Sequence, residues 1–135
     1  TDHMSVLEWG GERSAALRAR LANIAPNQVA TTIVSYEEQI RGWMAYLARA
    51  QNLVQEVEAY RRLRQHLDNY RGIPVLDFDE QAAAEFQRLR RGRIRVGTMD
   101  LRIAAIVLSR SATLLSGNLA DFRKVPGLDV QDWTR

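Results

Sequence analysis

The sequence predicts a single α/β domain built around a parallel sheet. Short apolar segments typical of buried strands alternate along the chain with longer segments of helical periodicity, an alternation typical of parallel sheets. One helical segment, residues 100–109, is apolar nearly all round, as expected of a helix buried in the core. A chain of 135 residues is long enough for one core but not for two, so we expect one domain over residues 1–135.

The N-terminal third of the sequence predicts two helices, a strand and the start of a third helix. Apolar positions near helical spacing predict helices over residues 2–9 and 14–24. The β-branched segment VATTIV, residues 29–34, predicts a buried strand. Ser35 is then expected to cap the next helix, and Glu38, three residues on, completes a capping box.

The central third is mostly helical. Apolar residues keep a spacing of three to four over residues 35–70, and we expect a break near residues 50–52, because one continuous rod would exceed the diameter of a small domain. The segment PVLDF, residues 74–78, predicts a short strand. Asp79 is expected to cap a further helix, which runs into a cluster of arginines.

The last third predicts alternating short elements. After the apolar helix over residues 100–109, we expect a strand at 113–115, a turn at 117–118, a helical turn at 119–123 and a final strand around 128–130. In open parallel sheets, ligands bind beyond the carboxyl ends of the strands, so residues just after each strand are the first candidates for a site.

The amino-acid composition limits which catalytic and metal-binding side chains are available. The chain has no cysteine and only two histidines, which excludes thiolate chemistry and leaves a histidine-rich metal site poorly supplied. Metal chemistry would rest on carboxylates, and oxygen ligands favour Mg²⁺ or Mn²⁺. No apolar stretch is long enough to span a membrane, and the N-terminus carries no pattern of a secretion signal. We therefore expect no membrane span, and the alternative that a leader once preceded Thr1 stays open because the first residue is not Met.

Positive charge is carried almost entirely by arginine, since Lys124 is the only lysine in a chain of net charge +3. Five arginines crowd into the segment from Arg88 to Arg95. This cluster is either a solvated helix end or a patch that faces phosphates.

Three carboxylates fall at or near the expected ends of strands. Glu38 lies in the helix after VATTIV, Asp100 opens the apolar helix, and Asp121 follows the segment TLLSGN, with Asn118 beside it as a neutral oxygen ligand. Converging carboxylates repel one another, so keeping them ionised together requires a cation. Each has a structural alternative: a capping-box partner for Glu38, an N-cap for Asp100 and a surface helix acid for Asp121.

Three segments resemble one known family. Residues 97–133, GTMDLRIAAIVLSRSATLLSGNLADFRKVPGLDVQDW, resemble the C-terminal half of PIN-domain ribonucleases of the VapC toxin type. TIVSYEEQIRG, residues 32–42, resembles the family's second motif, in which a Glu lies four residues before a Gly. The opening TDHMS is similar to the segment that follows the family's first strand.

The resemblance implies a three-layer α/β/α fold and a function. It implies a homodimeric, cytoplasmic endoribonuclease toxin, dependent on Mg²⁺ or Mn²⁺, that cleaves RNA phosphodiesters and is neutralised by a cognate antitoxin. By similarity, Glu38, Asp100 and Asp121 would be catalytic and would hold the metal together with Asn118. The accessory residues would be Asp2, Thr98 and Ser116, the last two as short hydroxyls that orient ligands or water.

The sequence departs from the family pattern at its start. The family's first metal-binding Asp would stand immediately before Thr1, and Asp2 matches a secondary position two places later. The apolar first strand, central in the family's sheet, is also missing from the sequence, so we expect that the natural protein has residues before Thr1. If it does not, we expect impaired folding or an inactive, metal-poor site.

Two alternatives to the nuclease stay open. A degenerate PIN-like domain would bind RNA or a protein without cutting, as the missing first Asp favours. A small nucleotide-binding α/β domain ranks last, because no Gly-rich phosphate loop follows an expected strand.

Residues 43–70 are also a candidate surface for the antitoxin, or else part of the domain's own core. The apolar residues concerned are Trp43, Tyr46, Leu47, Leu53, Val57 and Tyr60. Arg41 and the arginine cluster are candidates for guiding RNA.

Overall fold

The computed structural model describes residues 12–24 and 28–134. The helices are α2 (Glu12–Leu21), α3 (Ile33–Ala48), α4 (Leu53–Arg71), α5 (Glu80–Arg91), α6 (Thr98–Ser109) and α7 (Leu119–Phe122). The strands are β1 (Thr31–Thr32), β2 (Val75–Leu76), β3 (Thr113–Leu115) and β4 (Asp129–Gln131). The helix expected over residues 2–9 lies outside the described residues.

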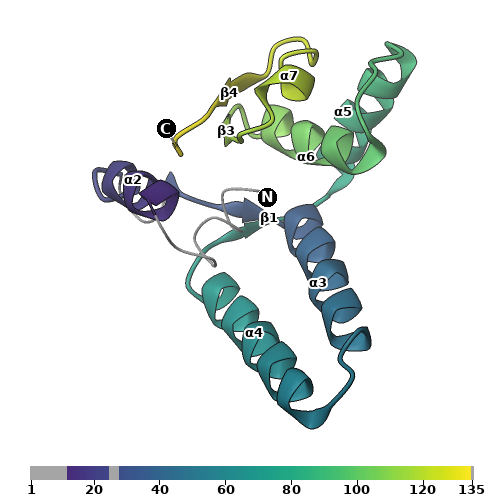
Figure 1. Ribbon diagram of the computed structural model, residues 1–135. Coiled ribbons are helices and arrows are strands. Elements are labelled where there is room, and N and C mark those ends of the chain that lie inside the picture. Colours follow the sequence, from purple (N-terminus) through teal and green to yellow (C-terminus); the bar gives the residue numbers. More distant parts are fainter. Residues whose placement is uncertain (1–11, 25–27, 135) are drawn as a thin grey trace.

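Helices α3 and α4 form an antiparallel hairpin that projects away from the rest of the domain (Figure 1). The predicted break is confirmed, because α3 ends at Ala48 and the Asn52 side chain accepts a hydrogen bond of 2.9 Å from the backbone N–H of Gln55, which caps α4. At the other end of the hairpin the His66 ring is fully buried and stacks on Tyr36, with 5.2 Å between ring centroids. Ring packing thus joins the two helices near β1.

The strands form two parallel pairs. Thr31 and Thr32 of β1 lie opposite Val75 and Leu76 of β2, and β3 pairs with β4 along all three residues of each strand. The α/β class with parallel strands is confirmed. Among the described residues, however, the strands make two separate pairs rather than one sheet of four, and no described residue forms the central strand that the family resemblance implies.

The third helix begins earlier than its sequence predicts. Thr32, not Ser35, is the N-cap of α3, and its hydroxyl accepts a hydrogen bond of 2.9 Å from the backbone N–H of Ser35. The expected strand over residues 29–34 is therefore shorter, and the predicted capping box of Ser35 and Glu38 is wrong. Tertiary packing explains the earlier helix start, because helical geometry places Val34 in the core. The Thr32 hydroxyl meanwhile accepts a hydrogen bond from a backbone N–H of the first turn.

The core lies between α5, α6, β3 and α7. Helix α6 contributes the largest share, and its buried residues are Leu101, Ile103, Ala104, Ala105, Ile106 and Val107. The small side chains of Ala104 and Ala105 allow close approach of the neighbouring α5, whose Ala82 is also fully buried. Asp79 caps α5 as predicted, accepting a hydrogen bond of 2.9 Å from the backbone N–H of Ala82.

The two ends of the described chain meet through one arginine. The guanidinium of Arg20 in α2 lies 4.9 Å from the ring centroid of Trp133 and donates a hydrogen bond of 3.4 Å to the carbonyl of Asp132. Within the described residues, no helix is both long enough and apolar enough to cross a membrane.

Candidate functional site

Asp100 lies in the first turn of α6 and is half-buried. The N-cap of that helix is Gly97, so the alternative that Asp100 is an N-cap is wrong. A carboxylate in the first helical turn interacts favourably with the positive end of the helix dipole. Thr98 is the first residue of the same helix and is exposed. The buried body of α6 therefore presents one acid and one hydroxyl at its N-terminal end.

Glu38 lies on α3, two turns beyond β1, and is also half-buried. Helix α3 packs against α6, so the helices that carry Glu38 and Asp100 are neighbours. The packing follows from Val34 at the start of α3, which belongs to the same buried cluster as Leu101 and Ile103 of α6. Apolar contacts thus place both acids on adjoining helices.

Asp121 lies in α7, in a local network of hydrogen bonds. One of its carboxylate oxygens accepts a hydrogen bond from the side-chain amide of Asn118 at 3.1 Å, and the other accepts one from the Lys124 ammonium at 3.2 Å. These two contacts, with the amide first, hold the pKa of Asp121 below its ordinary value. The buried hydroxyl of Ser116 accepts a hydrogen bond of 3.0 Å from the backbone N–H of Asn118, which orients the start of the helix.

Replacing Asn118 with alanine is expected to raise the pKa of Asp121 towards its ordinary value, because the amide contact is the largest cause of its lowering. A lowered pKa means that the ionised carboxylate favours the folded state above the unfolded pKa, and that this contribution is lost as pH falls through the folded pKa. In the variant, the stabilising contribution of the ionised Asp121 carboxylate should therefore be lost at a higher pH than in the wild type. The measurement is a pH titration of the Asp121 carboxyl carbon by NMR.

Lys124→Gln provides the comparison, and we expect a smaller rise of the pKa of Asp121 because the lysine contacts rank below the amide contact. An Asp121 titration unchanged in Asn118→Ala would contradict the assignment of the amide as the main cause. The contact of Lys124 with Asp121 was not predicted from the sequence. The i,i+3 spacing of Asp121 and Lys124 on a short helix is the pattern that indicates it.

The acids Glu38, Asp100 and Asp121, named here the candidate acids, have the oxygen donors that a hard divalent cation prefers. Across residues 12–24 and 28–134, however, no group of three or more Asp, Glu, His or Cys side chains gathers closely enough to hold a metal ion. Asp2 lies outside the described residues. The donor chemistry therefore fits Mg²⁺ or Mn²⁺, whereas the described residues alone do not complete a metal site.

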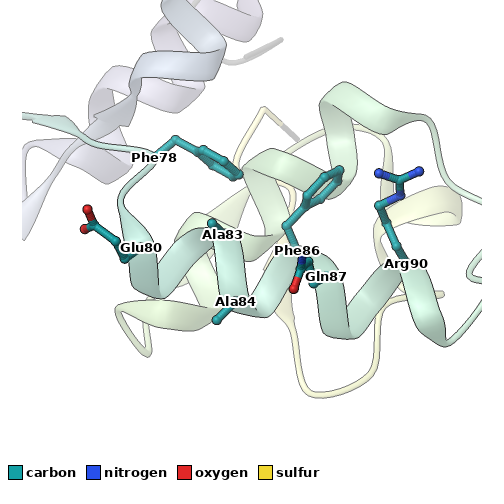
Figure 2. A pocket seen from close by; sticks show the side chains of 7 residues that line it. All are labelled: Phe78, Glu80, Ala83, Ala84, Phe86, Gln87 and Arg90. Atoms are coloured by element: carbon teal, nitrogen blue, oxygen red, sulfur yellow. The ribbon is translucent and has the colours of Figure 1, made fainter.

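A shallow groove lies elsewhere, on α5 and the segment before it (Figure 2). Its volume is about 450 Å³. Its lining residues are Phe78, Glu80, Ala83, Ala84, Phe86, Gln87 and Arg90. Its floor is largely apolar, and the rings of Phe78 and Phe86 pack edge to face. None of the candidate acids lines it, so the groove and the candidate acids are separate features.

Comparison with known proteins identifies the family. Over 128 residues the chain is 27% identical to the ribonuclease VapC1 of Haemophilus influenzae, covering 91% of this chain and 88% of that protein. It is 35% identical over 65 residues to the tRNA(fMet)-specific endonuclease VapC of Salmonella typhimurium, covering 45% of this chain and only about half, 49%, of that protein.

Solved structures agree with these sequence relatives. The VapBC-1 structure from nontypeable Haemophilus influenzae superposes with a TM-score of 0.74 at 25% identity, covering 91% of this chain and 88% of that chain. The DNA-bound VapBC structure from Salmonella typhimurium gives a TM-score of 0.71 at 27% identity, covering 87% and 84%. The PIN-domain family model matches residues 6–128, which include all three candidate acids. The chain therefore belongs to the PIN-domain family.

Proposed function

We propose that the chain is a metal-dependent endoribonuclease toxin of the VapC type, neutralised by a cognate antitoxin. The observation that carries this proposal is the match to the PIN-domain family model over residues 6–128. The relative that covers most of the chain, VapC1 of Haemophilus influenzae, is named a ribonuclease. The solved VapBC structures support a toxin–antitoxin assignment. The cytoplasm, where RNA is available, is the expected place of action, and the homodimer implied by the resemblance stays a prediction.

Glu38, Asp100 and Asp121 are proposed to hold Mg²⁺ or Mn²⁺, with the Asn118 amide oxygen as a further ligand. Such a cation, when bound, activates water and offsets the negative charge that develops on the phosphodiester. The chain's own polar groups would orient the acids: Asn118 and Lys124 fix the Asp121 carboxylate. Ser116 and Thr98 are proposed accessory residues, and Asp2 is the acid outside the described residues that we propose to add to the site.

The first test of the proposal combines RNA cleavage with a metal-binding measurement. We expect cleavage of RNA with Mn²⁺ or Mg²⁺ and none with EDTA. Independently of cleavage, Mn²⁺ should raise the melting temperature, because a ligand that binds only the folded state stabilises it. Neither cleavage nor a shift in melting temperature with any divalent cation would contradict the metal-dependent nuclease.

A non-catalytic PIN-like binding domain is the second candidate function. It is favoured by the finding that the described residues gather no group of three potential metal ligands. This candidate predicts that RNA or a protein partner binds equally well with Mn²⁺ and with EDTA. It also predicts that no cleavage products form under either condition.

The α3–α4 hairpin is the proposed docking surface for the antitoxin. Exposed apolar side chains follow one another along the first half of α4, and we name them the hairpin stripe: Leu53, Val54, Val57 and Tyr60, with exposures of 77%, 80%, 57% and 58%. Tyr46 and Met44 of α3 are exposed as well. Such a stripe suits an amphipathic helix from a partner. Trp43 and Leu47 are half-buried and belong more to the hairpin itself.

Replacing Val57 with aspartate is expected to weaken antitoxin binding by at least about 30-fold, because a charge would be buried without a partner at the centre of the stripe. Folding should be unaffected, since Val57 is 57% exposed. Gln65→Asp places the same charge on an exposed position of the same helix and serves as the control. Titration of the antitoxin by isothermal calorimetry measures both. Equal affinities for Val57→Asp and wild type would rule out the stripe as the docking surface.

A further inference from the structure

The structure divides the arginine cluster into two kinds of residue. Arg88 donates hydrogen bonds of 3.0 and 2.8 Å to Glu85, and the Arg90 guanidinium lies 5.5 Å from the centroid of the Phe86 ring. Arg93 and Arg95 are exposed, and neither forms an ion pair with any residue in the described part of the chain. Two cations are thus engaged within the fold, and three are available to a ligand: Arg91 at the end of α5, and Arg93 and Arg95 beyond it.

In the segment between α5 and α6, exposed arginines alternate with half-buried aliphatic residues. Ile94 and Val96 are half-buried and pack against the core, whereas Arg93 and Arg95 between them are exposed. A backbone hydrogen bond of 3.0 Å from the N–H of Val96 to the carbonyl of Ile94 tightens the segment. The two aliphatic anchors hold the backbone on the domain, so both arginines are carried on a supported loop rather than on a loose one.

Arg93 occupies a backbone conformation that its side chain does not favour. Its φ is +54°, in the left-handed region at the end of α5, where glycine is the usual residue. The glycine of this helix end is Gly92, one position earlier, with ordinary right-handed geometry. Glycine would be less strained than arginine at this position, so the Arg93 side chain does not help the backbone to adopt it.

The loop lies beside one of the candidate acids. The Lys124 ammonium donates to the backbone carbonyl of Arg95 at 3.4 Å and to the Asp121 carboxylate at 3.2 Å, so one side chain connects the loop with α7. At its other end the loop leads directly into α6, whose first turn carries Asp100. The loop that carries Arg93 and Arg95 therefore adjoins α6 and α7, the helices of two of the three candidate acids.

We propose that residues 92–97 form a phosphate-binding loop for an RNA strand, with Arg93 and Arg95 contacting backbone phosphates on one side of the candidate acids. Planar guanidinium groups bind phosphate oxygens in pairs of hydrogen bonds, and two such groups on a supported loop neutralise successive phosphates. The inference rests on the proposed function, because it supplies the substrate contact of that same site.

The test measures RNA binding apart from cleavage. Fluorescence anisotropy of a fluorescein-labelled single-stranded RNA is recorded in EDTA at several salt concentrations, with wild type, Arg93→Gly, Arg95→Gln and the double variant. We expect the double variant to bind about 10-fold more weakly or worse at moderate salt. The slope of log affinity against log salt should fall by about 1.4, as expected when two contacts to a single strand are lost.

Arg88→Gln is the matched control, because it removes a charge from the same cluster that is already engaged with Glu85; we expect less than about a 2-fold change. Arg93→Gly adds a second readout. It should melt at a higher temperature than wild type while binding RNA more weakly, since it relieves the left-handed backbone and removes the charge.

The outcomes separate the loop from the nuclease. RNA affinity unchanged in the double variant, or as weak in Arg88→Gln as in the double variant, would overturn the loop assignment. So would a double variant that keeps RNA affinity but loses the antitoxin, because the loop would then be a protein contact. RNA binding that depends on Arg93 and Arg95, with no RNA cleavage in Mn²⁺, would support the loop assignment and contradict the proposed nuclease activity. RNA cleavage in Mn²⁺ together with unchanged RNA affinity in the loop variants would support the proposed nuclease and overturn the loop assignment.

Discussion

Replacing Asp100 with asparagine is expected to reduce RNA cleavage by about 10²–10³-fold or more while the domain stays folded. Asp100 is half-buried in the first turn of α6, the most buried helix described, so its carboxylate is held on a rigid element. Asparagine keeps the shape and one oxygen but removes the charge. Loss of the favourable helix-dipole contact costs only about 0.3–1 kcal/mol of stability, which is small beside the loss of activity.

The measurement is the initial rate of RNA cleavage in Mn²⁺, with circular dichroism melting as the check on folding. Asp68→Asn is the matched control, because Asp68 is an exposed acid on α4 whose contacts are to Arg64 and Arg71 of the same helix. It should cleave at nearly the wild-type rate. If Asp100→Asn retained full activity, Asp100 would have no part in the reaction.

Truncating Ile106 to alanine is expected to lower the free energy of unfolding by about 2–5 kcal/mol. The Ile106 side chain has no exposed surface, and its neighbours Ala104 and Ala105 are too small to fill the space that it leaves. A loss of this size is a large part of the roughly 5–15 kcal/mol that stabilises a typical domain. The expected consequence is a protein that is partly unfolded at physiological temperature.

Urea denaturation followed by circular dichroism measures the effect, provided that the m-value stays constant. Val54→Ala is the control, because Val54 is 80% exposed and its truncation should change the free energy of unfolding by no more than about 0.5 kcal/mol. A loss below 1 kcal/mol for Ile106→Ala would mean that the core around α6 collapses around the cavity, against the close packing inferred for this helix.

Elements that are fixed by local pattern were predictable from the sequence, including β3 over residues 113–115. Periodicity and caps act locally, so the break before Asn52 and the cap at Asp79 were both predicted correctly. The segment VATTIV was predicted as a strand of six residues, but only Thr31 and Thr32 are in β1. A β-branched run fits a strand or a buried helix start, and the choice depends on the core that Val34 enters, which no local pattern contains.

The sequence pattern predicts that Asp121 follows β3, as observed, and that Asp100 opens the apolar helix, whereas α6 begins two residues earlier, at Thr98. The separations between the candidate acids were not predictable. How closely the helices that carry Glu38 and Asp100 approach depends on side chains packed between them. The link from Asp121 through Lys124 to the Arg95 carbonyl joins residues far apart in sequence, and therefore only the folded chain reveals it.

The two short pairs of parallel strands and helix α6 differ in how well they tolerate substitution. Ladders of two and three residue pairs fix few backbone positions, and three of the five residues in β1 and β3 are threonines. By contrast, α6 meets the core on nearly every side and needs small apolar residues at Ala104 and Ala105. Helix α6 is therefore the part of the described fold that most resists substitution, whereas exposed strand positions such as Thr113 and Asp129 tolerate it.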